Sequence, residues 1–164
     1  MSLEDQVTQL YLDAREDVYR YLLTLGLRPA QAQENTQEAF LRLHQASRSR
    51  EAIRNPRAWI FRVAHNLAMT QRTRESRNVA AEPDWMAQQP DQRQGAESKL
   101  IDKEKMTRLR AALAGLSPQQ RQCLHLRAEG LRYHEIAEVA GIGISTVGEF
   151  LSRAMRRLRQ AVND

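Results

Sequence analysis

Residues 131–161 read LRYHEIAEVAGIGISTVGEFLSRAMRRLRQA, and this stretch decides the fold of the C-terminal part of the chain. Apolar residues recur at helical steps on both sides of a glycine-rich corner at residues 141–144, which predicts two short helices. We expect Gly141 to adopt the left-handed conformation just past the first helix, and Ser145 to cap the second helix through its hydroxyl. Two helices that meet closely at such a corner form a helix-turn-helix.

The second of these helices is expected to be amphipathic, with an apolar seam and arginines mainly off that seam. The inward residues are Val147, Leu151, Ala154 and Leu158. The arginines are Arg153, Arg156, Arg157 and Arg159. An ordinary pair of packed helices with a solvated basic face is the alternative, because a motif match alone remains a hypothesis.

Positive charge is concentrated in two blocks of a chain whose net charge is +5. Residues 47–77 hold eight basic and two acidic side chains, and residues 99–164 hold twelve and seven, whereas residues 78–98 hold one and four. Most of these cations are arginines, whose planar guanidinium can donate two parallel hydrogen bonds to phosphate. Two basic blocks with an acidic spacer indicate two contacts with a polyanion, although solvated helix faces would explain either block alone.

Cysteine content and hydropathy favour a cytoplasmic protein. Cys123 is the single cysteine, so it cannot form an internal disulfide, and a reducing compartment is expected. The first residues lack the basic segment and apolar run of a signal peptide. No apolar segment approaches the roughly 20 residues that span a bilayer, so we expect no membrane insertion.

Helical periodicity recurs along most of the chain, with no strand pattern and no internal repeat. The predicted fold class is therefore all-α, with two small helical bundles joined by a flexible linker and a helix-turn-helix in the second bundle. The first bundle is expected at residues 1–77 and the second at residues 99–164. Residues 78–98 are acidic, rich in glutamine and poor in aliphatic side chains, a composition typical of a flexible linker in which Trp85 and Met86 stand out.

Residues suited to catalysis or metal binding are scattered. The histidines are His44, His65, His125 and His134, and no pair of them has metal-ligand spacing. Cys123 and His125 are two residues apart, so on a helix their side chains do not face each other. No glycine-rich phosphate loop is present. We therefore expect no catalytic residue, no metal, no cofactor and no small-molecule substrate, and the protein is not expected to be an enzyme.

Three stretches taken together resemble a known family. They are QAQENTQEAFLRLHQ at residues 31–45, NPRAWIFRVAHNLAMTQRTR at residues 55–74 and LAGLSPQQRQCLHLRAEGLRYHEIAEVAGIGISTVGEFLSRAMRRLRQ at residues 113–160. In order and spacing they resemble the bacterial sigma factors of the extracytoplasmic-function group, and the resemblance extends over nearly the whole chain. It implies two helical domains, called regions two and four, that bind core RNA polymerase and promoter DNA. It also implies an anti-sigma factor as a partner.

The first two stretches imply two kinds of contact for region two. Residues 37–41, Gln-Glu-Ala-Phe-Leu, match a family motif on the helix that grips the polymerase clamp. The residues expected to bind core polymerase are Gln37, Glu38, Phe40 and Leu41. The loop and helix at residues 48–74 correspond to the part that opens and reads the minus-ten element, where separated strands meet a basic groove. The residues expected to bind there are Arg54, Asn55, Arg57, Arg62, Asn66, Arg72 and Arg74.

Trp59 lies within the minus-ten stretch and has two interpretations. Because it begins the apolar series that continues with Ile60 and Val63, we expect it mainly in the core. A platform on which an unpaired base stacks is the alternative.

The third stretch implies that region four lays the helix of residues 145–160 in the major groove at the minus-thirty-five element. The residues expected nearest the base edges are Thr146, Glu149, Ser152 and Arg153. The arginines expected to hold phosphates are Arg121, Arg132, Arg156, Arg157 and Arg159. The family often has a lysine after its Thr-Val, and here that position is Gly148.

Two other classes of protein remain open from the sequence. One is a stand-alone helix-turn-helix transcriptional regulator, which would bind duplex DNA as a dimer at a palindrome. The other is a helical adaptor that binds only protein. Binding to core polymerase discriminates the sigma factor from both.

Overall fold

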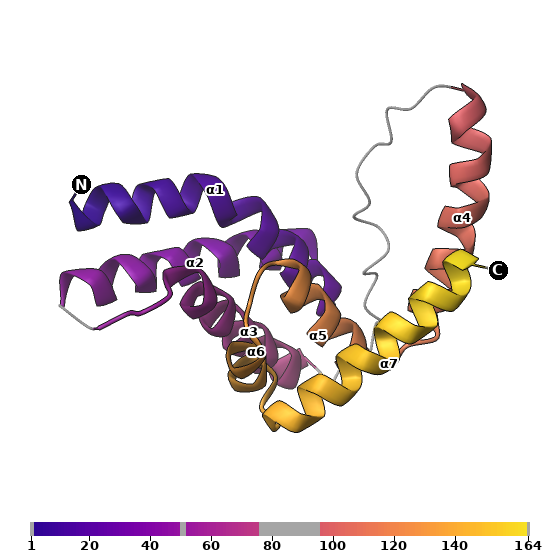
Figure 1. Ribbon diagram of the computed structural model, residues 1–164. Coiled ribbons are helices and arrows are strands. Elements are labelled where there is room, and N and C mark those ends of the chain that lie inside the picture. Colours follow the sequence, from indigo (N-terminus) through magenta and orange to yellow (C-terminus); the bar gives the residue numbers. More distant parts are fainter. Residues whose placement is uncertain (1, 50–51, 76–95, 164) are drawn as a thin grey trace. The chain divides into compact units, whose positions relative to one another are not determined.

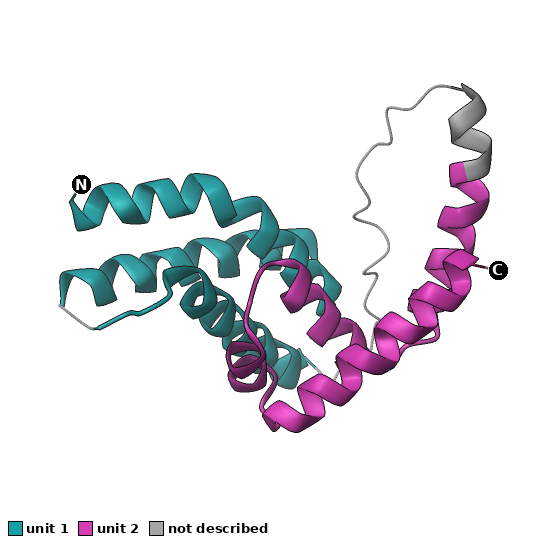
Figure 2. Ribbon diagram, in the orientation of Figure 1, with its two compact units in different colours: residues 1–88 teal, residues 89–164 magenta. Residues whose placement is uncertain are grey.

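Helices account for the regular structure of this protein in the computed structural model, which describes residues 2–49, 52–75 and 96–163 (Figure 1). The described residues form seven helices and no strand, so the all-α prediction is confirmed. The chain divides into two units, residues 1–88 and residues 89–164 (Figure 2). No helix among the described residues is long and apolar enough to cross a membrane.

Unit 1 contains three helices, each packed against the other two: α1 (Leu3–Thr24), α2 (Pro29–Arg48) and α3 (Pro56–Glu75). Their apolar faces meet in a core that includes Ala14, Val18, Tyr21, Leu22, Ala32, Ala39, Phe40, Leu43, Ile60, Phe61, Ala64 and Ala68. α1 begins with a capping box, in which the hydroxyl of Ser2 accepts from the amide of Asp5 at 3.1 Å and the Asp5 carboxylate accepts from the amide of Ser2 at 3.3 Å.

The turn between α1 and α2 is made by a glycine that ends the first helix and a proline that begins the second. Gly26 has a φ of 95°, which glycine adopts without steric cost, and it ends the first helix. Leu27 is buried, and its amide donates to the carbonyl of Leu22 at 3.3 Å. Pro29 occupies the first turn of α2, where its missing amide hydrogen costs nothing.

Unit 2 contains α4 (Ala96–Ala114), α5 (Pro118–Ala128), α6 (Tyr133–Ala140) and α7 (Ile144–Asn163). α7 packs against each of the other three, and α5 also packs against α6. The core of unit 2 includes Ala112, Leu116, Cys123, Leu126, Leu131, Ile136, Ala137, Val139, Val147, Leu151 and Ala154. Cys123 is therefore a small core residue, as the apolar residues around it indicate.

The corner between α6 and α7 confirms one prediction and corrects another. Gly141 has φ 69° and ψ 34°, the left-handed conformation expected past a helix end, and its amide donates to the carbonyl of Ala137 at 2.9 Å. The prediction that Ser145 caps α7 is wrong, because α7 already begins at Ile144. The carbonyl of Gly143 accepts the amide of Val147 at 3.1 Å, so Gly143 is the cap. Glycine is well tolerated there, and the corner needs only two residues after Gly141.

The predicted linker at residues 78–98 falls mostly outside the described residues, as does the Trp85–Met86 pair. α4 begins at Ala96, so helix starts three residues before the predicted boundary of the second bundle at residue 99.

Candidate nucleic-acid interface

The residues predicted to bind separated strands lie at the start of α3 and along it. Asn55 caps this helix, because its side-chain Oδ1 accepts from the amide of Ala58 at 3.3 Å and its carbonyl accepts from the amide of Trp59 at 3.0 Å. Asn55 and Arg54 are both exposed at this helix start. The cap fixes where the preceding loop enters α3, so Asn55 has a structural role in addition to any contact with DNA.

Arg62 and Asn66 share one face of α3, since they are four residues apart. Trp59 precedes Arg62 by three residues and lies on the same side of the helix. Asn66 is exposed, and Arg62 and Trp59 are half-buried. The sequence favoured a core position for Trp59, but the structure leaves it half-buried. The interior face of α3 is already occupied by Ile60 and its neighbours.

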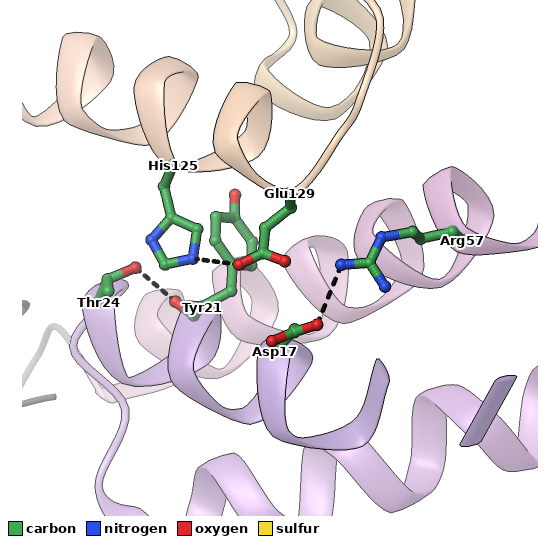
Figure 3. A network of polar contacts seen from close by, with 6 residues as sticks. All are labelled: Asp17, Tyr21, Thr24, Arg57, His125 and Glu129. Atoms are coloured by element: carbon green, nitrogen blue, oxygen red, sulfur yellow. Dashed lines mark hydrogen bonds and ion pairs between the residues drawn. The ribbon is translucent and has the colours of Figure 1, made fainter. Parts of the chain in front are cut away.

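Arg57 points a different way from Arg62. Its guanidinium pairs with the carboxylate of Asp17 on α1, with Nη2 and Oδ2 3.1 Å apart (Figure 3). It also lies over the ring of Phe61, 5.4 Å from the centroid. Arg57 thus joins α3 to α1 and belongs to the packing of unit 1. The remaining predicted residues of this set, Arg72 and Arg74, are exposed in the last turn of α3.

Two buried residues of α3 were not singled out as core residues in the sequence. Phe61 is fully buried, and its ring meets that of Tyr21 edge-on with centroids 5.5 Å apart. His65 follows it by one helical turn and is 7% exposed. Its Nδ1 lies 2.9 Å from the hydroxyl of Tyr21, and burial lowers its pKa from 6.5 to about 4. Phe61 and His65 are four residues apart, on the side of α3 that also carries Ala64 and Ala68. This spacing was the sequence signal that could have placed both residues in the core.

The predicted polymerase-binding residues of α2 divide into exposed and buried members. Gln37 is exposed, and Leu41, one turn later, is 51% exposed although it is apolar. Glu38 is half-buried and pairs with Arg42, with Oε1 and Nε 3.1 Å apart. Phe40 is 5% exposed, and its ring packs edge-on against Tyr11 with centroids 5.1 Å apart. Phe40 therefore holds α2 against α1, and Gln37 and Leu41 form the accessible part of the motif.

Gln37 also lies at a surface hollow between α1 and α2. The hollow has a volume of about 390 Å³, and its wall includes Tyr11, Arg15 and Tyr19 from α1. Arg15 lies over the Tyr11 ring at 5.5 Å from the centroid. The exposed Gln37 is thus continuous with a recess whose wall carries aromatic and charged side chains.

The outward face of α7 brings together most of the residues predicted to reach base edges. Glu149, Ser152 and Arg153 follow at helical steps and are exposed, whereas Thr146 is half-buried. Arg156, which was predicted to hold phosphate, is exposed one turn after Ser152. The opposite side of the helix is buried in unit 2 through Val147, Leu151 and Ala154. The arrangement presents a carboxylate, a hydroxyl and two guanidinium groups along about two turns of one helix.

Arg132 and Arg159, both predicted to hold phosphates, are exposed. Arg132 caps α6, and its amide donates to the Glu135 carboxylate at 2.8 Å. Glu135 is 9% exposed, so its carboxylate serves as a structural cap at the start of α6. A glutamate three residues after a helix start was the signal that the sequence offered for it.

Two further predicted phosphate ligands, Arg121 and Arg157, already donate to backbone carbonyls. Arg121 Nη1 lies 2.8 Å from the carbonyl of Leu116, and Arg157 Nη1 lies 3.1 Å from that of Gly115. Both carbonyls belong to the turn between α4 and α5. Arg121 and Arg157 thus contact the protein backbone, whereas Arg153 and Arg156 are exposed on the outward face of α7.

An aromatic residue beside α7 was missed in the sequence. Tyr133, at the start of α6, is 43% exposed, and the guanidinium of Arg127 lies 5.6 Å from its ring centroid. A β-carbon at Gly148 would lie 3.9 Å from Cε2 of Tyr133, an ordinary contact. Gly148 therefore borders the Tyr133 ring and could carry a side chain without a clash.

The titratable groups of α5 do not form a catalytic arrangement. Burial raises the pKa of the Cys123 thiol to about 11, so it is protonated and poorly nucleophilic at neutral pH. His125 pairs with Glu129 one turn later, with Nε2 and Oε1 3.6 Å apart (Figure 3). Among the described residues, no three histidine, cysteine or acidic side chains are grouped to hold a metal ion.

Two family models match the chain, one in each unit. The model for sigma-70 region 2 matches residues 10–78, and the model for sigma-70 region 4 matches residues 106–158. The first match contains α2 and α3, and the second contains the corner and the outward face of α7.

Curated relatives with similar sequences are named as ECF RNA polymerase sigma factors. SigK of Mycobacterium ulcerans is 29% identical over 141 residues, which are 80% of this chain and 72% of SigK. BldN of Streptomyces coelicolor is 26% identical over 98% of this chain and 61% of BldN. SigE of Mycolicibacterium smegmatis is 28% identical over 87% of this chain and 56% of SigE. The matched segments thus span about half to three quarters of these relatives.

Solved structures share the fold of the chain. The sigma factor RpoE of Bartonella quintana, solved in complex with the anti-sigma factor NepR, superimposes with a TM-score of 0.67 at 24% identity over 95% of this chain and 96% of RpoE. CnrH, solved in complex with the cytosolic domain of CnrY, gives a TM-score of 0.55 at 18% identity over 98% of this chain and 89% of CnrH.

Proposed function

The chain belongs to the sigma-70 family, in its extracytoplasmic-function group, and we propose that it is an alternative sigma factor. In this proposal it binds core RNA polymerase and directs promoter recognition, DNA melting and transcription initiation in the bacterial cytoplasm. The observation that carries the proposal is the match of a region 2 model and a region 4 model, in that order, to the two units of the chain. The protein has no catalysis of its own, because the polymerase supplies the chemistry of RNA synthesis.

Unit 2 reads duplex DNA at the minus-thirty-five element. α7 lies in the major groove with Glu149, Ser152 and Arg153 toward the base edges. Geometry allows a guanidinium to donate two hydrogen bonds to guanine and a carboxylate to accept from the cytosine amino group. The exposed Arg156 and Arg132 are suited to phosphates, which set the register of the helix without specifying sequence.

Unit 1 holds the separated strands at the minus-ten element. The face of α3 that carries Trp59, Arg62 and Asn66 offers an indole ring, a guanidinium and an amide within about two helical turns. An unpaired base can stack on the half-buried ring while the polar groups bind the backbone. Because Arg57 is paired with Asp17, we assign it to the support of this face.

Unit 1 also binds the polymerase, through the exposed Gln37 and Leu41. An exposed leucine at the centre of a helix contributes little to folding and can add apolar contact area in a complex. We further propose that an anti-sigma factor restrains the chain. RpoE was solved with the anti-sigma factor NepR, and CnrH was solved with the cytosolic domain of CnrY.

Co-purification with core polymerase tests the proposal. The full chain and purified core enzyme are mixed and separated by gel filtration, with Leu41→Asp as the disrupted variant and Leu12→Asp as the matched control on another exposed leucine. We expect the wild type and Leu12→Asp to elute with the core and Leu41→Asp to elute free. A wild-type chain that never elutes with core enzyme, yet binds a palindromic duplex as a dimer, would assign it to the stand-alone regulators instead.

A further inference from the structure

Three backbone carbonyls at the end of α4 accept hydrogen bonds from two arginines of other helices. Arg121 of α5 donates through Nη1 to the carbonyl of Leu116 at 2.8 Å and to that of Ala114 at 3.4 Å. Arg157 of α7 donates through Nη1 to the carbonyl of Gly115 at 3.1 Å. α4 has no basic residue in its own last turn. The two guanidinium groups therefore donate to the carbonyl of the last residue of α4 and to those of the two residues that follow it, and their charge complements the negative end of the helix dipole.

Gly115 provides the space that the guanidinium of Arg157 occupies. A β-carbon at residue 115 would lie 3.0 Å from Nε of Arg157 and closer still to the rest of the group. Gly115 is not among the glycines with a positive φ, so its backbone would accept alanine without strain. A side chain at position 115 would therefore displace the exposed guanidinium of Arg157, whereas the backbone conformation itself does not require glycine.

The contact ties the recognition helix to the rest of unit 2. Arg157 lies one turn after Arg153 on α7, and 42 residues of sequence separate it from Gly115. Although Arg157 is exposed, its hydrogen bond joins α7 to the turn after α4, and either rotation of α7 about its axis or translation along it would lengthen that bond. Those are the two movements that would shift Glu149 and Arg153 relative to a base pair.

We propose that Arg157 and Arg121 are positioning residues, which clamp the turn between α4 and α5 and thereby set the orientation of α7. This proposal rests on the proposed function in one respect only, that α7 reads DNA. It replaces the expectation from the sequence that both arginines bind phosphate. The phosphate contacts then come from exposed arginines such as Arg156, which is next to Arg157 in the sequence and therefore about 100° from it around the helix axis.

A double-mutant cycle in the full chain tests the clamp without DNA. Gly115→Ala places a methyl group where the guanidinium lies, while it preserves every charge. The midpoint of thermal unfolding is measured for the wild type, Gly115→Ala, Arg157→Ala and the double variant. The clamp predicts that Gly115→Ala is less favourable when Arg157 is present than in the Arg157→Ala background. Equal shifts in the two backgrounds would overturn the clamp.

The second arm measures DNA binding by the holoenzyme, with a duplex that the wild-type holoenzyme selects from a randomised library. Gly115→Ala and Arg157→Ala should each weaken binding by about fivefold, the loss of one hydrogen bond, with an unchanged slope of log affinity against log salt. Arg156→Ala, the matched control, should reduce that slope by roughly 0.9, the value for one phosphate contact. A reduced slope for Arg157→Ala together with normal binding by Gly115→Ala would make Arg157 a phosphate ligand. If the wild type selects no duplex, the proposed function fails, and the thermal cycle still decides the clamp.

Discussion

Acidification should destabilise unit 1 through His65. The imidazole is 7% exposed, its Nδ1 faces the hydroxyl of Tyr21 at 2.9 Å, and burial lowers its pKa to about 4. In the unfolded chain the pKa is 6.5, so between pH 6.5 and 4 the unfolded state binds more protons. The contribution of neutral His65 is therefore fully present above pH 6.5 and is lost as the pH falls toward 4.

The size of this effect follows from the two pKa values. One pKa unit corresponds to about 1.4 kcal/mol, so the whole difference corresponds to about 3 kcal/mol, of which about 2 kcal/mol is lost between pH 7.5 and pH 5. Urea unfolding of the full chain, followed by hydrogen exchange of amides in α1 and α3, measures the free energy of unfolding of unit 1 at each pH.

Matched variants separate His65 from other titrating groups. His65→Gln should remove about 2 kcal/mol of the pH dependence between pH 7.5 and pH 5, whereas His44→Gln, at a half-buried histidine of the same unit, should retain it. If the wild type and His65→Gln lose stability in parallel over this range, the reasoning about His65 is refuted.

Three further predictions concern the candidate interface. Arg153→Ala should relax base preference at one position of the minus-thirty-five element and weaken binding of the preferred duplex by roughly 1–3 kcal/mol. An equal loss of affinity for all duplexes would contradict the prediction that Arg153 contacts a base. Phe40→Ala should lower the stability of unit 1 by about 3–5 kcal/mol in urea unfolding, and a variant that unfolds normally yet fails to bind core enzyme would show that Phe40 is a contact residue. Trp59→Ala should leave core binding intact and abolish promoter opening, measured by permanganate reactivity of unpaired thymines, and normal opening would return Trp59 to a structural role.

The backbone organisation was predictable because its signals are local. Apolar periodicity defined the helices, and Gly26, Pro29 and Gly141 ended or began them through their own backbone preferences. The cap of α7 was misplaced by two residues because the hydroxyl of Ser145 can accept a hydrogen bond from a backbone amide and glycine has no such side chain, whereas the geometry of the corner places Gly143 at the cap.

The roles of individual arginines were less predictable. An arginine that donates to a backbone carbonyl and one that binds phosphate occur in the same kind of sequence pattern. Arg57 turns to Asp17 across 40 residues, and Arg157 turns to Gly115 across 42. These partners are set by tertiary packing. The sequence pattern on α7 placed both Arg156 and Arg157 off the apolar seam and could not separate them.

Transcription in a purified system tests the central claim most directly. The template carries the duplex selected by the holoenzyme, upstream of a randomised minus-ten segment. Core polymerase is incubated on this template with and without the full chain, and the 5′ ends of the RNA are mapped. We expect transcripts that begin at a fixed distance from the selected element only when the chain is present. These transcripts should disappear when Leu41→Asp replaces the wild type. Transcripts that are the same with and without the chain would contradict its assignment as a sigma factor.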